Sequence, residues 1–157
     1  MQGAIAAIVV TAGLLAGLGV VNPAPAQADV FTGTWRRQNP VTFQYPSNWK
    51  CAGSTMASDG RSVAQNCLVR ATASPNWAQT VLVIRNLTSS NLPTDALVSF
   101  SKGGTEFFDY WRCPPSSLGP HGLSVCYSAT KYAPYQIMTF AQWRYGYEDA
   151  KGYSEYW

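Results

Sequence analysis

Hydrophobic and polar positions alternate in short runs along most of the chain, and the first segment is the exception. Residues 4–21 form an uncharged run of Ala, Ile, Val, Leu and Gly. Two prolines follow, and Ala26–Gln27–Ala28 then has the small–x–small form of a cleavage site. We therefore expect residues 1–28 to be a signal peptide, with a membrane anchor as the alternative. Residues 29–157 are expected to form a single disulfide-stabilised β domain.

The pattern after residue 29 is typical of β-strands. Alternating positions, β-branched runs and bounding Pro or Asn turns predict strands at 41–45, 68–72, 79–84, 105–111, 125–131 and 136–145. A Pro-Thr-Asp sequence, an apolar stretch and a closing Gly-Gly predict at most one short helix, near 94–101. About six or seven strands in a chain of this size predict a mainly β fold, an antiparallel sandwich or a barrel-like domain.

Part of this pattern occurs twice. Residues 49–63 (WKCAGSTMASDGRSV) align without a gap with residues 111–125 (WRCPPSSLGPHGLSV). The shared positions include both Trp and both Cys, and further matches follow after a three-residue insertion in the first copy. We interpret this as two similar units, about 41–86 and 103–145, that pack as a pseudo-twofold single domain. A chance recurrence of a Cys-loop pattern is the alternative.

The cysteines indicate the compartment. The chain has four of them, all after the predicted signal peptide, and an even count in a small exported domain implies disulfides. Of the three possible pairings, proximity in the sequence favours Cys51–Cys67 and Cys113–Cys126. Each enclosed loop would contribute about 3 kcal/mol if chain entropy dominates. The expected location is therefore secreted, in the extracellular medium, with no membrane contact after signal cleavage.

Composition and charge argue against several classes of function. The 157 residues carry a net charge of +3, too little for a nucleic-acid binder, and contain a single histidine, His121. A Ser–His–carboxylate site would have to combine His121 with Ser117 or Ser124 and with Asp109 or Glu106. No nucleophile elbow, phosphate-binding loop or Cys/His metal spacing supports such chemistry. We expect no enzyme activity, no catalytic residues, no metal site and no cofactor.

Aromatic residues gather at both ends of the mature chain. Phe31 and Trp35 stand beside two arginines near its start, and five aromatics lie within residues 145–157. Tyr, Trp and Arg are concentrated at binding hot spots, but aromatic ends can equally add edge strands that cover the core. The start at Gly33–Thr34–Trp35 and the end at Tyr153 to Trp157 resemble small secreted bacteriocins of the lactococcin 972 type. This resemblance implies an antibacterial role.

These observations predict a non-catalytic exported β domain that binds another secreted or cell-surface protein. It would act as an inhibitor, or as a subunit or adaptor of a secreted assembly such as an antibacterial toxin. A glycan- or cell-wall-binding module using exposed Trp and Tyr is the first alternative, and a small secreted hydrolase is the second. The candidate binding residues are Trp35, Arg36, Arg37, Pro115, Pro120, His121, Tyr153, Tyr156 and Trp157.

Overall fold

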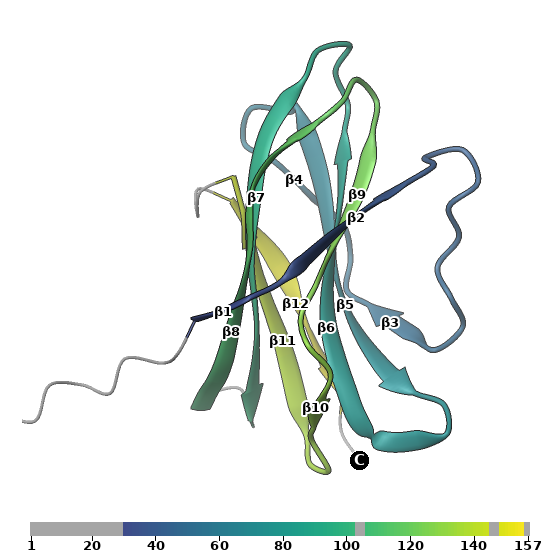
Figure 1. Ribbon diagram of the computed structural model, residues 1–157, viewed down its shortest axis with the longest axis vertical. Helices are drawn as coiled ribbons and strands as arrows, with labels where there is room; N and C mark the ends of the chain where they lie inside the picture. Colours follow the sequence, from purple (N-terminus) through teal and green to yellow (C-terminus); the bar gives the residue numbers. More distant parts are fainter. Residues whose placement is uncertain (1–29, 103–105, 145–147, 156–157) are drawn as a thin grey trace, which may run out of the picture.

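The computed structural model describes residues 30–102, 106–144 and 148–155, and these form two β-sheets packed face to face (Figure 1). None of them is helical, and so none belongs to a helix able to cross a membrane. The predicted signal peptide, residues 1–28, lies outside the described residues. The predicted mainly β sandwich is confirmed.

One sheet has five strands in the order β1-β8-β7-β11-β12, of which only the β1–β8 pair is parallel. Its strands are β1 (Val30–Thr32), β7 (Leu92–Lys102), β8 (Glu106–Leu118), β11 (Ile137–Trp143) and β12 (Glu148–Glu155). The other sheet has the order β2-β9-β6-β5-β3, with β10 added to β6 and β4 added to β5. Its strands are β2 (Thr34–Gln38), β3 (Trp49–Cys51), β4 (Thr55–Met56), β5 (Ser62–Ala71), β6 (Ser74–Asn86), β9 (Leu123–Tyr127) and β10 (Lys131–Tyr132).

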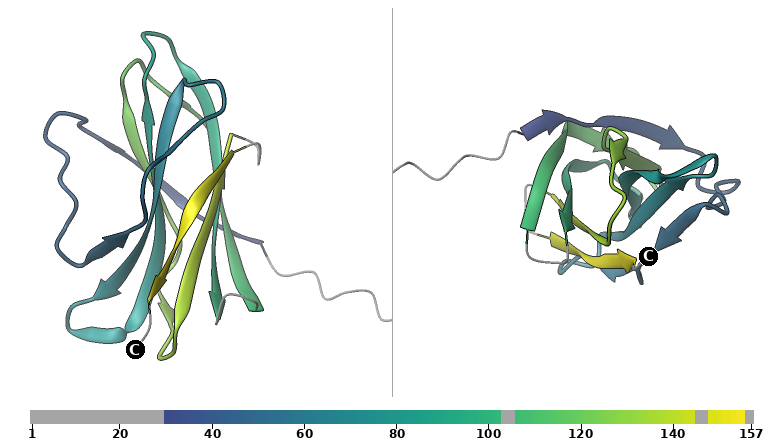
Figure 2. Two further views of the ribbon diagram at one scale, coloured as in Figure 1. Left: turned by 180° about the vertical axis from the view of Figure 1, so that it is seen from behind. Right: turned by 90° about the horizontal axis from the view of Figure 1, so that it is seen from below.

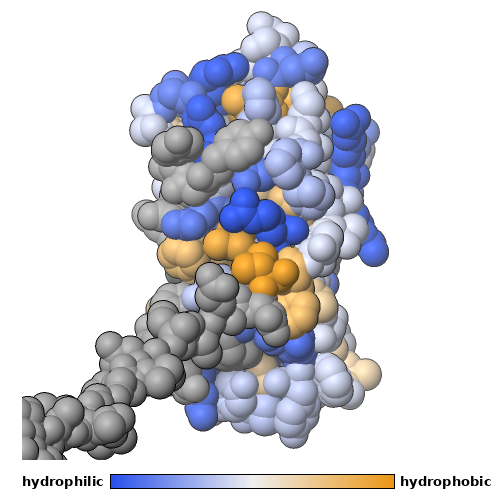
Figure 3. Space-filling view, turned by 60° about the vertical axis from the view of Figure 1, so that its left-hand side comes forward, coloured by the Kyte–Doolittle hydropathy of each residue, from blue (hydrophilic) through white to orange (hydrophobic). Residues whose placement is uncertain are grey.

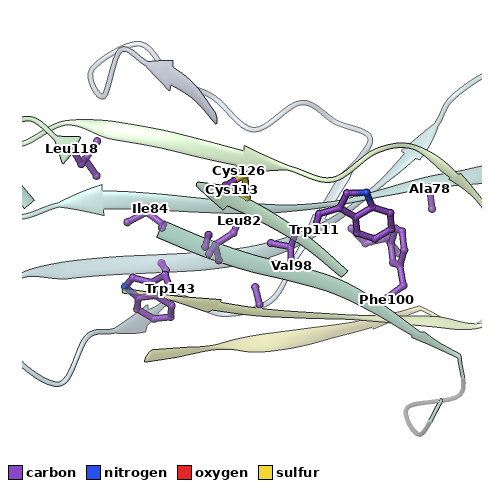
Figure 4. Close-up of a cluster of buried hydrophobic side chains, with 14 of the residues drawn as sticks. Ala78, Leu82, Ile84, Val98, Phe100, Trp111, Cys113, Leu118, Cys126 and Trp143 are labelled. Atoms are coloured by element: carbon purple, nitrogen blue, oxygen red, sulfur yellow. A yellow bond between two sulfur atoms is a disulfide. The ribbon is translucent and has the colours of Figure 1, made fainter. Parts of the chain in front are cut away.

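The main core lies between the two sheets (Figure 4). Its largest side chains are Trp111 and Trp143, which are 1% and 0% exposed. Two hydrogen bonds between β5 and β11 cross this core: Trp143 Nε1 donates to Ser62 Oγ over 3.2 Å, and Asn66 Nδ2 donates to Thr139 Oγ1 over 2.8 Å. Because buried polar groups must be satisfied, these pairs favour one alignment of the sheets over shifted ones.

The first described segment passes from one sheet to the other. β1 pairs with β8 of the five-stranded sheet, and β2 pairs with β9 of the seven-stranded sheet. Seen from below, this segment runs along one side of the sandwich (Figure 2). The crossing point is Gly33, where an added Cβ would lie 2.8 Å from Cys113 Sγ. Glycine is therefore required here for close packing.

Two predicted elements are wrong. Residues 41–45 form a turn and an irregular loop, not a strand. Pro40 and Pro46 lack the N–H groups that a strand ladder needs, and Asn39 holds a turn by accepting hydrogen bonds from Val41 N and Phe43 N. The proposed helix at 94–101 is instead part of β7. This strand is paired on both sides, by β8 and β11, and these non-local pairings override the local capping signal.

The disulfides join Cys51 to Cys67 and Cys113 to Cys126, the pairing expected from proximity. The first links paired residues of β3 and β5 within one sheet, whereas the second links β8 to β9 and so connects the two sheets. Such bonds are typical of exported proteins.

The two sequence units also differ in their strands. β5 and β6 of the first unit are neighbours in one sheet, but β9 and β11 of the second lie in different sheets. The topology therefore does not show the predicted pseudo-twofold.

Candidate functional site

The seven-stranded sheet carries a second hydrophobic cluster on the face turned away from the main core. Successive strand residues point to opposite faces, so even-numbered residues such as Leu82 and Ile84 fill the core, while Val81 and Val83 point outward. Val125 of β9 joins them and is 0% exposed. A sheet face this apolar requires a cover.

The loop between β2 and β3 supplies that cover. Phe43 and Trp49 pack against the outer cluster, and Tyr45 contacts both of them through its ring. The rings meet edge to face: Phe43 and Trp49 have centroids 6.2 Å apart at an interplanar angle of 64°, and Trp49 and Tyr127 have centroids 5.9 Å apart at 81°. Edge-to-face contacts of this kind are favourable beyond the area they bury.

An arginine completes this surface. The guanidinium of Arg36, on the neighbouring strand β2, lies 5.3 Å from the centroid of the Tyr127 ring, in cation–π geometry. Burial raises the pKa of the Tyr45 hydroxyl above 10.0. Burial also raises the pKa of Tyr127, against the opposing charge of Arg36. Both phenols are therefore neutral hydrogen-bonding groups at physiological pH. We call Arg36, Phe43, Tyr45, Trp49 and Tyr127 the aromatic face.

Two hollows open on either side of Phe43. The first, of about 320 Å³, is lined by both apolar and polar residues: Pro40, Phe43, Tyr45, Ser54, Val63, Ala64, Gln65, Val83, Arg85 and Leu123. The second, of about 430 Å³, is lined by Gln38, Asn39, Thr42, Phe43, Gln44, Pro46, Trp49 and Tyr127. Hollows of this size that combine apolar walls with a few polar groups are typical of binding sites.

The structure brings the predicted start-of-chain residues against the second cysteine loop. Trp35 Nε1 donates a hydrogen bond to Pro114 O over 2.7 Å, and Arg37 Nη2 donates to Ser117 O over 3.3 Å. Trp35 is half-buried and also packs on the main core. These two side chains thus support the edge of β8, whereas Arg36 between them points to the aromatic face.

The remaining predicted residues are spread over the molecule. Pro115 is exposed on β8, while Pro120 and His121 are exposed in the turn from β8 to β9. Tyr153 lies on β12, an edge strand, and its side chain is outside the described part. Tyr156 and Trp157 also lie outside the described residues. The aromatic ends thus add the edge strands β1, β2 and β12, as one of the two interpretations anticipated.

The groups required for a His-based hydrolase are far apart. Asp109 lies near the start of β8 and forms an ion pair with Lys131 over 3.0 Å. His121 follows the other end of β8, so the strand separates the two by about 30 Å at roughly 3.3 Å per residue. Among the residues that the structure describes, no group of three or more His, Cys, Asp or Glu could hold a metal ion.

Two other surfaces expose large apolar side chains. Trp77 and Tyr132 are paired residues of β6 and β10, 44% and 56% exposed, with ring centroids 5.6 Å apart. On the β1 side, Val30 and Phe31 are exposed, and Lys131 Nζ lies 5.1 Å from the Phe31 ring centroid. Figure 3 brings the β1 side forward and shows a hydrophobic patch at its middle.

Sequence reasoning missed most of the aromatic face. It treated residues 41–45 as a strand and Trp49 as part of a repeated structural set. The available signal was the close spacing of the aromatic residues Phe43, Tyr45 and Trp49 around Pro46. The contribution of Tyr127 could not be anticipated, since only the sheet order brings β9 beside β2 and β6.

The comparisons with known proteins found no match for this chain, either among protein families or among curated protein sequences.

Proposed function

We propose that this protein is an exported, non-catalytic β-sandwich that binds another secreted or cell-surface protein through its aromatic face. The observation that carries the proposal is the meeting of four aromatic rings, an arginine and two hollows on one sheet face. Tyr, Trp and Arg are the residue types that dominate protein-binding energy. Rigid rings on a disulfide-bonded sheet also lose little entropy on binding. The bound protein would be a target to inhibit or a fellow subunit of a secreted assembly.

The shape of this surface favours a protein over a glycan. Its rings stand edge to face, and aliphatic residues such as Val63, Val83 and Leu123 line part of the first hollow. A sugar ring needs a flat aromatic face bordered by polar groups, and it would leave hydroxyls unpaired against these aliphatic residues. An apolar side chain of a protein partner fills such a hollow without that cost.

The test is partner capture from the culture fluid of the producing organism. Tyr45 is 43% exposed and lines the first hollow, so Tyr45→Ala should reduce recovery of a stoichiometric partner at least tenfold. The matched control is Tyr132→Ala, which removes a tyrosine of at least equal exposure, 56%, from the separate Trp77–Tyr132 surface. A protein that is strictly monomeric in its native medium, or equal losses in both variants, would overturn the proposal.

The Trp77–Tyr132 pair supports a second candidate, a glycan-binding module. Both rings are exposed and lie on paired strands, so a sugar could stack on the indole of Trp77 beside the phenol of Tyr132. Under this candidate, the protein is retained on chitin, cellulose or cell-wall glycan, and Trp77→Ala abolishes retention while Tyr45→Ala does not. Passage of the unaltered protein through all three matrices rejects it.

A further inference from the structure

The second hollow of the aromatic face has an unusual combination of walls. Phe43, Trp49 and Tyr127 form its aromatic part, with Trp49 edge to face against both of the other rings. Gln38, Asn39 and Gln44 add side-chain amides to the rim, and no charged residue lines the hollow. Asn39 Oδ1 accepts a hydrogen bond from Val41 N, and the NH₂ group of this amide is its donor end.

These walls match the chemistry of a proline-rich segment. Pyrrolidine rings are compact and apolar and pack well against aromatic rings, and a polyproline II helix presents carbonyl oxygens with no internal hydrogen bonds. The amides on the rim are donors for those carbonyls. Because such a helix is already extended and stiff, it loses little entropy when it docks in an aromatic groove.

The charge beside the second hollow indicates which residues should flank the prolines of the ligand. Arg36 lies over the Tyr127 ring at the border of the hollow. The aspartates whose side chains the structure describes are all in ion pairs elsewhere: Asp59 with Arg144, Asp95 with Arg112 and Asp109 with Lys131. Arg36 therefore gives this border a positive group, and an acidic residue beside the prolines would complement it.

Resting on the proposed function, we infer that the second hollow binds a proline-rich segment of the partner protein, with an acidic residue next to Arg36. The ligand is an extended peptide with at least two prolines. It packs against Phe43, Trp49 and Tyr127 and accepts hydrogen bonds from the amides of the rim.

The experiment is a fluorescence-anisotropy titration with labelled synthetic peptides. The probes are decaproline, decaproline carrying two Glu at one end, decaproline carrying two Lys, and a Gly-Ser decapeptide. We expect saturable binding of the three proline peptides, the Glu-flanked one about threefold to tenfold tighter than the Lys-flanked one at low salt. Salt at 1 M should remove this preference. Equal affinity for decaproline and the Gly-Ser peptide, or no saturable binding up to 2 mM, overturns the inference.

Three variants separate the parts of the site. Gln44→Ala removes an exposed donor and should weaken decaproline binding about threefold to tenfold. Trp49→Phe should weaken it by a similar factor, because it replaces the indole with a smaller ring. Arg36→Gln should keep decaproline binding but abolish the Glu-over-Lys preference. Tyr132→Ala is the control and should change nothing. If Trp49→Phe fails to fold, the Gln44→Ala variant is the remaining test of the site. Decaproline binding by Gln44→Ala as tight as that of the unaltered protein would overturn the inference.

Failure here is distinguishable from failure of the proposed function. The capture test depends on Tyr45, which lines the first hollow but not the second. If capture still requires Tyr45 while the proline peptides fail to bind, the partner is recognised by other chemistry and only this inference falls. If capture does not require Tyr45, the proposed function falls.

Discussion

Asn86 shows how one buried side chain can organise several loops. It is 0% exposed, and its Nδ2 lies 2.7 Å from Ser90 O, 3.1 Å from Leu118 O and 2.8 Å from Gly119 O. Its Oδ1 accepts from the backbone N–H and the hydroxyl of Thr88. The motif Asn86–Leu87–Thr88, which matches a glycosylation acceptor, is thus occupied by internal hydrogen bonds.

We expect Asn86→Ala to lower the free energy of unfolding by about 2–3 kcal/mol, because buried carbonyls lose their donor. Urea denaturation measures this loss. The control is Asn91→Ala, an exposed position nearby, which should change the free energy by less than about 0.5 kcal/mol. Similar losses in the two variants would contradict the role assigned to Asn86.

A second residue-scale prediction concerns acid stability. The hydrogen bond from Arg144 and that from the Arg61 backbone hold the pKa of Asp59 below its ordinary value of 3.8. A carboxyl whose pKa is lower in the folded state stabilises the fold above its unfolded pKa, and this stabilisation is lost as the pH falls through the folded pKa.

Asp59→Asn should therefore destabilise the protein at neutral pH and make its melting temperature less sensitive to pH below about 4. Melting curves between pH 2 and 7 for both proteins measure this. Curves that coincide over the whole range would show that the Asp59–Arg144 pair contributes nothing to stability.

At the scale of elements, the decisive feature is the passage of the first strand segment between sheets. β1 and β2 are separated only by Gly33, whose added Cβ would lie 2.8 Å from Cys113 Sγ and 3.0 Å from Tyr127 O. Both atoms belong to the packed junction between the sheets, so neither can move freely.

Gly33→Ala should therefore cost about 1–3 kcal/mol of stability through overpacking at this junction. Gly119→Ala is the matched control, because its nearest neighbour would be 3.9 Å away, an ordinary contact. Thermal or urea denaturation measures the stability of the two variants. Equal stability of the Gly33 variant and the unaltered protein would show that the crossing point is not tightly packed.

At the scale of the whole molecule, the two disulfides have different positions although their sequence separations, 16 and 13, are similar. Chain entropy alone gives each about 3 kcal/mol. Cys113 and Cys126 are 0% exposed, belong to the main core and join the sheets, whereas Cys51–Cys67 lies in the outer cluster within one sheet.

We expect the double variant Cys113→Ala/Cys126→Ala to lose about 1–2 kcal/mol more than Cys51→Ala/Cys67→Ala, because it also leaves a cavity in the core. Denaturation of both variants under oxidising conditions measures the difference. Losses of equal size would show that loop closure alone accounts for both bonds.

The sequence by itself determined the features that depend on local pattern. A β-branched run predicted the strand around residues 79–84, and its correspondence to the second unit predicted the strand around 136–145. Nearness in the chain predicted the disulfide pairing. Only the tertiary structure decided that residues 94–101 pair as the strand β7, that the two cysteine loops differ, and that Phe43, Trp49 and Tyr127 meet on one face. These outcomes depend on which strands become neighbours and which side of a sheet is covered. Pairing and burial join residues far apart in the chain, so a local pattern does not record them.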